Sequence, residues 1–303
     1  MNGTLQLPTE LVKHVSAILG SQGEAWLDRL PRFVEDLRSE WSIEVKEPYA
    51  AGEFNFVAAA IRTNGEPVVL KIAPPYHDGE YLREAEFLRH RDGRGAVALL
   101  AQDIERRAIL LGQAIPGKNL AEIFTGAELD AIDPAIDVLH SISEPAPKDL
   151  INVKTIDDWF AGLRRFEDTV FSADYAVKAL DLYQRLTATR PLLYLHGDFH
   201  PANVVSAQRE EYLAIDPKGV IGHIGYDIAV FLNNFHWWLE NDPDVRQKLD
   251  AAVLSFSKAF DISPIELRQW AFAQMVLGAW WSFDEMPEHY DNATVAKADV
   301  WNV

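Results

Sequence analysis

The sequence has no cysteine, few basic residues relative to acidic ones and no long apolar run, and each deficit excludes a class of function. Without cysteine the chain cannot form a disulfide, a thiolate nucleophile or a cysteine-bound metal site. Its 28 lysines and arginines are outnumbered by 46 aspartates and glutamates, which gives a net charge of −18. This balance argues against nucleic acid and anionic membrane surfaces as partners, because both require a basic face.

The longest charge-free apolar stretch, Trp270 to Phe283, is shorter than the roughly 20 residues that cross a bilayer. The opening segment MNGTLQLPTELVKHVSAILG lacks the basic start and the small-residue cleavage site of a signal peptide. We therefore expect a cytoplasmic protein. An apolar fraction of 48% with 24% charged residues is typical of a globular chain that buries a core.

Apolar periodicity divides the chain into two regions of different character. Short β-type runs are expected at residues 42–46, 54–61, 67–72 and 107–111, with an amphipathic helix over 79–91 and helical spacing before residue 41. Beyond about residue 113 the pattern is mainly helical, over 128–142, 155–171, 174–189, 226–239, 244–260 and 264–282. Strands with one helix among them, followed by a run of helices, predict an α+β fold in two lobes, residues 1–113 and 114–303.

The densest polar cluster is LLYLHGDFHPANVV, which is followed by YLAIDPKGVIG. Apolar runs deliver His196, Asp198 and Asn203, and then Asp216, into turns with the H-x-D-x-x-x-x-N spacing of a kinase catalytic loop. In that chemistry one carboxylate handles the acceptor hydroxyl, while the asparagine and a second carboxylate supply oxygen ligands to Mg²⁺. Two other interpretations remain open: a polar surface hairpin, and a hydrolytic metal centre ligated by His196, Asp198, His200 and Asp216.

The N-terminal lobe carries an independent signal. Lys71 ends the strand PVVLK, the position at which kinases place a phosphate-binding lysine, and Glu84 on the following helix is placed to pair with it. Glu86 would face another side of that helix and is the weaker candidate. Upstream, AAGEFNFV contains a single glycine, Gly52, and is expected to form a hairpin over the nucleotide phosphates.

Together, these residues and motifs resemble the aminoglycoside phosphotransferases of the protein-kinase-like superfamily, most closely the streptomycin 6-kinase and hydroxyurea-resistance kinase subgroup. The resemblance extends from about residue 23 to 288 through GEAWLDRLPRFVEDLRSEWSIEV, REAEFLRHRDGRGAVALLAQD, YDIA and AWWSFDE. It implies an antiparallel sheet with one key helix in a nucleotide-binding lobe (1–113) and helices in a catalytic and acceptor-binding lobe (114–303). The chain departs from the family at Gly222–Ile224, where G-D-P is common, and in its glycine-poor nucleotide-covering loop.

The resemblance also implies ATP- and Mg²⁺-dependent transfer of a γ-phosphate to a hydroxyl. Asp198 would be the catalytic base, His196 would brace its loop, and Asn203 and Asp216 would hold Mg²⁺. Lys218 in IDPK is either a salt-bridge partner or a group near the transferred phosphate.

For the nucleotide, the resemblance implies that Lys71 contacts the phosphates while paired with Glu84. The connector backbone at Gly112 and Ala114 would hydrogen-bond the adenine. Asp227 in YDIA would be a structural acid that holds the catalytic loop.

The acceptor is expected on the helical lobe, facing Asp198. Its candidate lining is acidic and aromatic: Asp157, Asp158, Trp159, Trp281, Asp284, Glu285 and Glu288. Residues 1–113 carry 13 basic and 17 acidic side chains, whereas residues 114–303 carry 15 and 29. Carboxylates and flat rings suit a cationic, polyhydroxylated molecule, although acidic surface helices are also common without any ligand.

The leading hypothesis is therefore a small-molecule O-phosphotransferase acting on an aminoglycoside, an aminocyclitol or a hydroxyurea-like acceptor. A housekeeping metabolite kinase of the same fold is the alternative within this class. Two hypotheses belong to other classes of protein: a nucleotide-binding regulatory module without transfer activity, and a His/Asp metal-dependent hydrolase.

Overall fold

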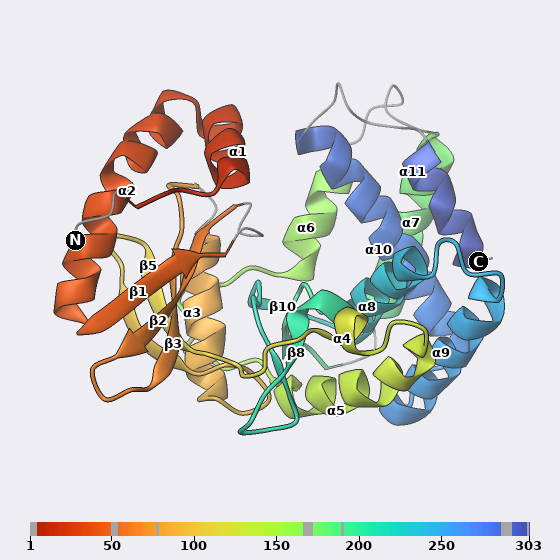
Figure 1. Cartoon of the computed structure of the whole chain (residues 1–303). Coiled ribbons are helices and arrows are strands. Elements are labelled where there is room, and N and C mark those ends of the chain that lie inside the picture. The colour runs from red at the N-terminus through yellow and green to blue at the C-terminus, as the bar shows by residue number, and fades with distance from the viewer. Residues whose placement is uncertain are drawn as a thin grey trace. The chain divides into compact units, whose positions relative to one another are not determined.

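The computed structural model of the chain divides into two compact units, Met1–Gly117 and Lys118–Val303, here the N-terminal and C-terminal units (Figure 1). It describes residues 5–49, 54–76, 79–165, 172–188, 191–285, 293–301 and 303.

A five-stranded antiparallel sheet forms the centre of the N-terminal unit. In sheet order its strands are β1 (Ile43–Pro48), β2 (Phe56–Arg62), β3 (Pro67–Ile72), β5 (Ala108–Gly112) and β4 (Leu99–Asp103). Aliphatic residues fill the central strand β3, whose side chains alternate between the two faces. Val68, Leu70 and Ile72 belong to the core on one face, so Lys71 projects from the opposite face.

Helices cover both faces of this sheet. α1 (Thr9–Leu19) and α2 (Ser21–Glu40) share one core cluster with β2 and β3, to which they contribute Leu11, Trp26 and Leu30. Each fully buried side chain of this size stabilises the fold by roughly 1.5–3 kcal/mol. α3 (Glu80–Arg91) lies on the opposite face and ends at Asp92, whose left-handed backbone (φ 49°) stops the helix.

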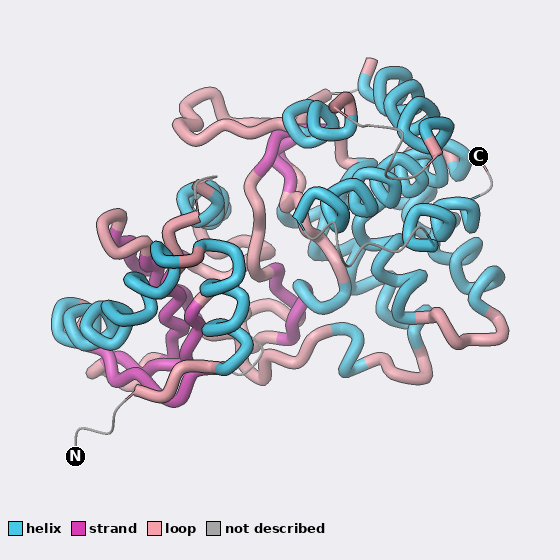
Figure 2. The backbone as a smooth tube through the Cα atoms, turned by 90° about the horizontal axis from the view of Figure 1, so that it is seen from above, coloured by secondary structure: helices cyan, strands magenta, loops and turns pink. Residues whose placement is uncertain are grey.

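The C-terminal unit is built mainly of helices (Figure 2). These are α4 (Leu120–Ile123), α5 (Ile132–Ile142), α6 (Ile156–Leu163), α7 (Ala173–Thr187), α8 (Gly225–Trp238), α9 (Val245–Phe260), α10 (Pro264–Glu285) and α11 (Ala293–Ala296). Tyr226, Ile228 and Phe231 of α8 are fully buried, and the helix is apolar around most of its circumference. Such a helix must be enclosed by others, and α10 and α9 pack against it.

Two short β structures in this unit position its polar loops. β7 (Leu193–Leu195) lies between β6 (Glu144–Pro145) and β10 (Val220–Gly222), and β8 (Val204–Ser206) pairs with β9 (Tyr212–Ala214). The loop 196–203 therefore connects β7 to β8, and residues 215–219 connect β9 back to β10. Because each connection starts and ends on paired strands, the two polar segments are held side by side.

The predicted α+β architecture, with an antiparallel N-terminal sheet and a helical C-terminal region, is confirmed. The helix expected over 155–171 ends at Leu163, where Arg164 and Arg165 close the last turn, and residues 166–171 lie outside the described residues. The edge strand β4 was not predicted. It pairs with one neighbour only, and all of its residues are half-buried. Its sequence therefore does not show the alternation of apolar and polar residues that reveals a strand. No helix within the described ranges is long and apolar enough to cross a membrane.

Candidate active site

A buried ion pair joins the central strand and α3 of the N-terminal unit. The Nζ atom of Lys71 lies 2.7 Å from Oε2 and 2.9 Å from Oε1 of Glu84. The two residues are 7% and 3% exposed, so neither charge could lose its partner without a large desolvation cost. The structure thus contains the predicted contact, with the glutamate that the sequence favoured over Glu86.

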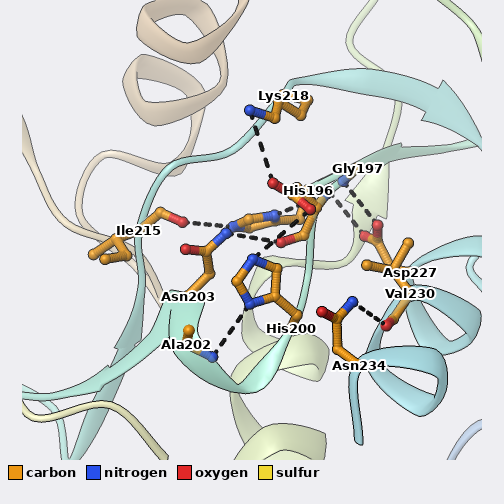
Figure 3. A network of polar contacts seen from close by, with 11 residues as sticks. His196, Gly197, His200, Ala202, Asn203, Ile215, Lys218, Asp227, Val230 and Asn234 are labelled. Carbon is orange, nitrogen blue, oxygen red and sulfur yellow. Dashed lines mark hydrogen bonds and ion pairs between the residues drawn. The ribbon is translucent and has the colours of Figure 1, made fainter. Parts of the chain in front are cut away.

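His196, which follows β7 in the C-terminal unit, links the two polar segments. Its Nδ1 accepts a hydrogen bond from the backbone N–H of Asp198 (3.2 Å), so Nε2 carries the proton and donates it to the carbonyl of Ile215 (2.9 Å; Figure 3). Burial lowers the pKa of His196 to about 3, which keeps the ring neutral. Both ring nitrogens are thereby used to brace the loop.

The carboxylate of Asp227, in the first turn of α8, holds the same loop from the other side. It accepts hydrogen bonds from the backbone N–H groups of His196 (2.9 Å) and Gly197 (2.7 Å), which confirms the predicted contact with the loop (Figure 3). Burial raises the pKa of Asp227 to about 7, against the opposing effect of these two bonds. Gly197 has φ +84°, and a Cβ there would lie 3.0 Å from Trp159 Cη2, so the turn requires glycine.

Two nitrogen-bearing side chains face the carboxylate of Asp198. Lys218 Nζ lies 3.7 Å from Oδ2, and His200 Nε2 lies 3.8 Å from Oδ1. In Figure 3, Lys218 and His200 lie on opposite sides of the His196 ring. The Nδ1 atom of His200 accepts a hydrogen bond from Ala202 N–H, and burial lowers the pKa of this histidine, although Asp198 opposes the effect.

Asn203 and Asp216 leave the same end of the β8–β9 ribbon. Ile215 N–H donates to the Asn203 carbonyl, which continues the ladder one step beyond the strands. The Asn203 amide nitrogen donates to the carbonyl of Asp198 (3.0 Å), so the loop 196–203 sets the orientation of this amide. Asp216 adopts φ +59°, a left-handed conformation that costs a non-glycine residue about 1 kcal/mol or more.

The hydrolytic metal centre loses its support here. Across the part of the chain that the structure describes, no three His, Asp or Glu side chains are grouped so that they could hold a metal ion. Both ring nitrogens of His196 are bonded to the backbone, which excludes this residue as a ligand without rupture of the loop. Asn203 and Asp216, the residues predicted to hold Mg²⁺, offer an amide oxygen and a carboxylate and so differ from a His/Asp ligand set.

Comparison with known families matches residues 41–285 to the aminoglycoside/hydroxyurea antibiotic resistance kinases. The chain belongs to this family. It is therefore a small-molecule kinase of a family that uses ATP. The family and the type of enzyme predicted from the sequence are both confirmed.

Named relatives cover nearly the whole chain. A streptomycin 6-kinase of Streptomyces glaucescens is 27% identical over 98% of this chain and 97% of its own length. A hydroxyurea phosphotransferase of Kitasatospora aureofaciens is 26% identical over 99% of this chain and 87% of its own length. Among solved structures, the amicoumacin kinase hAmiN, in complex with AMP-PNP, Ca²⁺ and Ami, is 12% identical with a TM-score of 0.68, over 94% of this chain and 96% of that one. This likeness confirms the protein-kinase-like fold.

The connector of the kinase follows β5. The backbone N–H of Gly112 donates to the carbonyl of Ala98 (2.9 Å), so this group is already used within the N-terminal unit. Ala114 lies in the turn beyond the strand, and its contact with adenine stays a prediction. Gly52, predicted to cover the phosphates, lies outside the described residues.

The predicted acceptor-lining residues that the structure describes lie on α6 and α10. Asp158 forms a capping box with Thr155, in which its Oδ2 accepts the Thr155 N–H at 2.7 Å, while Asp157 pairs with Arg164 at 2.6 Å. Both carboxylates thus have structural partners on or next to α6. Asp284 is exposed on α10; the side chain of Glu285 and the whole of Glu288 lie outside the described residues.

An aromatic cluster borders the catalytic loop of the kinase. The ring of Trp159 lies edge-on to Trp281 (5.4 Å between centroids) and tilted on Tyr226 (5.5 Å), and it contacts Gly197. The sequence identified the two tryptophans as candidates but missed Tyr226. Burial raises the pKa of Tyr226 well above its ordinary value, and the charge of nearby Asp198 adds to the shift. The sequence signal that could have identified Tyr226 was its position next to Asp227 in YDIA.

Proposed function

We propose that this kinase transfers the γ-phosphoryl group of ATP, with Mg²⁺, to a hydroxyl of a small cationic acceptor, with Asp198 as the base. The observation that carries the proposal is the loop around Asp198, whose backbone is bonded on one side to the buried Asp227 and on the other through His196 to Ile215. A base acts efficiently only if its carboxylate is held within hydrogen-bond reach of the hydroxyl. A loop fixed at both sides meets this requirement before the acceptor arrives.

Asn203 and Asp216 are the residues that would hold Mg²⁺. Their donor chemistry fits, because an amide oxygen and a carboxylate are hard oxygen ligands, and the bond from Asn203 to Asp198 orients the amide. When bound, Mg²⁺ neutralises charge on the nucleotide phosphates. Lys71, oriented by Glu84, is the residue of the N-terminal unit that we assign to those phosphates.

A cationic acceptor is supported by the chemistry beside the loop. The half-buried rings of Trp159 and Trp281 offer faces that attract a cation, and Asp284, one helical turn beyond Trp281, adds a carboxylate. Asp158 and Glu285 are further candidates for this lining. The named relatives act on streptomycin and on hydroxyurea, of which only streptomycin is a polyhydroxylated cation.

The experiment is an acceptor screen with γ-labelled ATP and Mg²⁺. Its panel contains streptomycin, other aminoglycosides, amino alcohols, hydroxyurea and neutral sugars matched in hydroxyl count. We expect label on cationic acceptors and none on the neutral sugars. Label on hydroxyurea or neutral sugars alone would refute the cationic acceptor but leave the kinase chemistry, and Asp198→Asn with wild-type turnover would refute the base.

A further inference from the structure

Lys218 is a cationic side chain to which the proposed function assigns no role, although it faces the proposed base. Its Nζ lies 3.7 Å from Asp198 Oδ2, with the two side chains 26% and 35% exposed. At that separation the pair is longer than a hydrogen bond. A partly exposed ion pair of this kind contributes only about 0–1 kcal/mol to stability.

The backbone fixes Lys218 against the catalytic loop. Its N–H donates to the carbonyl of His196 (2.7 Å), and the N–H of Gly219 reaches the same oxygen (3.3 Å). The Cβ of Lys218 would lie 3.1 Å from a Cβ at Gly197, so its stem packs directly on the turn before Asp198. Immediately downstream, β10 pairs with β7 through Val220 and Leu195, which anchors the segment on its other side.

These contacts hold the backbone and Cβ of Lys218 against the loop, and its ammonium group lies 3.7 Å from the Asp198 carboxylate. In the proposed reaction the acceptor hydroxyl lies at Asp198 to lose its proton, and the phosphorus that it attacks lies about 3–3.5 Å from the hydroxyl oxygen before the bond forms. A group within 4 Å of the Asp198 carboxylate is therefore close to the phosphoryl oxygens as well. Charge stabilisation by groups already in place is the largest contribution to this type of catalysis.

We propose that Lys218 is a catalytic residue that contacts the phosphoryl group during transfer, an inference that rests on the proposed phosphotransfer. The acceptor oxygen forms a bond to the γ-phosphorus, and the bond from that phosphorus to the β–γ bridging oxygen breaks. The bond's electron pair leaves with ADP, and the hydroxyl proton passes to the carboxylate of Asp198. Lys218 binds the negative charge on the phosphoryl oxygens.

The test compares Lys218→Met, Lys218→Arg and the control Lys258→Met, which removes one positive charge from an exposed position on α9. Calorimetry with Mg²⁺ measures the affinity of each protein for ADP alone and for ADP with aluminium fluoride, which mimics the phosphoryl group in transfer. Turnover is measured with the best acceptor of the screen, or as slow ATP hydrolysis with water as acceptor.

For Lys218→Met we expect turnover to fall about 100-fold, and affinity for ADP with aluminium fluoride to fall by a similar factor. Affinity for ADP alone and the unfolding midpoint should match those of the wild type. Lys218→Arg should recover part of the loss because it keeps the charge, and Lys258→Met should behave as the wild type.

Turnover of Lys218→Met within threefold of the wild type would overturn the inference. So would an equal loss of affinity for ADP with and without aluminium fluoride, because the lysine would then act on the ground state or on the fold. These outcomes are separate from failure of the proposed function. Phosphotransfer itself is refuted if the wild type binds ADP but neither hydrolyses ATP nor binds ADP with aluminium fluoride. Only the acceptor class is refuted if the wild type hydrolyses ATP but labels no cationic acceptor.

Discussion

Replacement of Asp227 by alanine measures how strongly the catalytic loop is held. The carboxylate is 1% exposed and accepts two backbone N–H groups, those of His196 and Gly197. Alanine leaves both donors buried and unpaired, at about 1–3 kcal/mol each, so we expect a loss of roughly 2–6 kcal/mol in the free energy of unfolding. Asp227→Asn keeps one acceptor oxygen and should lose about half as much. Either value is large against the roughly 5–15 kcal/mol of a typical domain.

Urea denaturation followed by tryptophan fluorescence gives the free energies, and amide hydrogen exchange reports on the two N–H groups directly. Exchange at His196 and Gly197 should accelerate in Asp227→Ala. The matched control is Asp181→Ala, which removes an exposed carboxylate paired with Arg185 and should cost less than about 0.5 kcal/mol. An Asp227→Ala protein as stable as this control, with unchanged exchange at both amides, would refute the reasoning.

Four further predictions concern the acid itself, the base, the buried pair and the aromatic cluster. Since burial raises the pKa of Asp227 from 3.8 to about 7, the folded protein retains there a proton that the unfolded chain releases, and stability should fall as pH rises between these values. Urea denaturation at several pH values tests this fall in stability, and the Asp227→Asn protein is the control because it lacks the titrating carboxyl group. Asp198→Asn should lower phosphotransfer by about 10²–10⁴-fold while calorimetry shows unchanged ADP affinity. Glu84→Gln removes the carboxylate charge that faces the buried Lys71 ammonium group and should destabilise the protein by about 3–5 kcal/mol on urea denaturation. Trp159→Ala should raise the KM for a cationic acceptor about 3- to 30-fold, the equivalent of a cation–π contact, with little change in the KM for ATP.

Controls separate these effects from general damage to the fold. Trp237→Ala removes a 53% exposed tryptophan of α8 and should leave the acceptor KM unchanged. An equal rise in KM for both substrates in Trp159→Ala would contradict a role in acceptor binding. A Glu84→Gln protein as stable as the wild type would contradict the argument from the buried ion pair. A wild type whose stability rises from pH 4 to 7, relative to Asp227→Asn, would contradict the raised pKa of Asp227.

Most of the fold was predictable because its signals act over a few residues. The alternation of β3 placed Val68, Leu70 and Ile72 on one face and Lys71 on the other, and the helix that follows carries Glu84 at the matching height. The edge strand β4 was not predictable in this way. It gains its structure from a single neighbour, β5, and its own residues show no period.

The acceptor side illustrates a different limit. Acidic residues on α6 were predicted to line the acceptor site, and the structure shows in addition that Asp158 caps its own helix through Thr155 and that Asp157 pairs with Arg164. A carboxylate in a sequence does not reveal which nearby donor it binds. The contact of Trp159 with Gly197 joins residues from two elements, and the packing of α6 beside the loop decides it.

The sequence by itself identified the candidate residues for the chemistry of this kinase, because His196, Asp198, Asn203 and Asp216 stand in the connections between short strands. It also determined the strand-and-helix order of the α+β fold. Only the tertiary structure decided the surroundings of Asp198, where Lys218 lies 3.7 Å from the carboxylate. Spacing along the chain decides which residues share a turn. Burial and the backbone hydrogen bonds between turns that are distant in sequence decide which charged side chains come together.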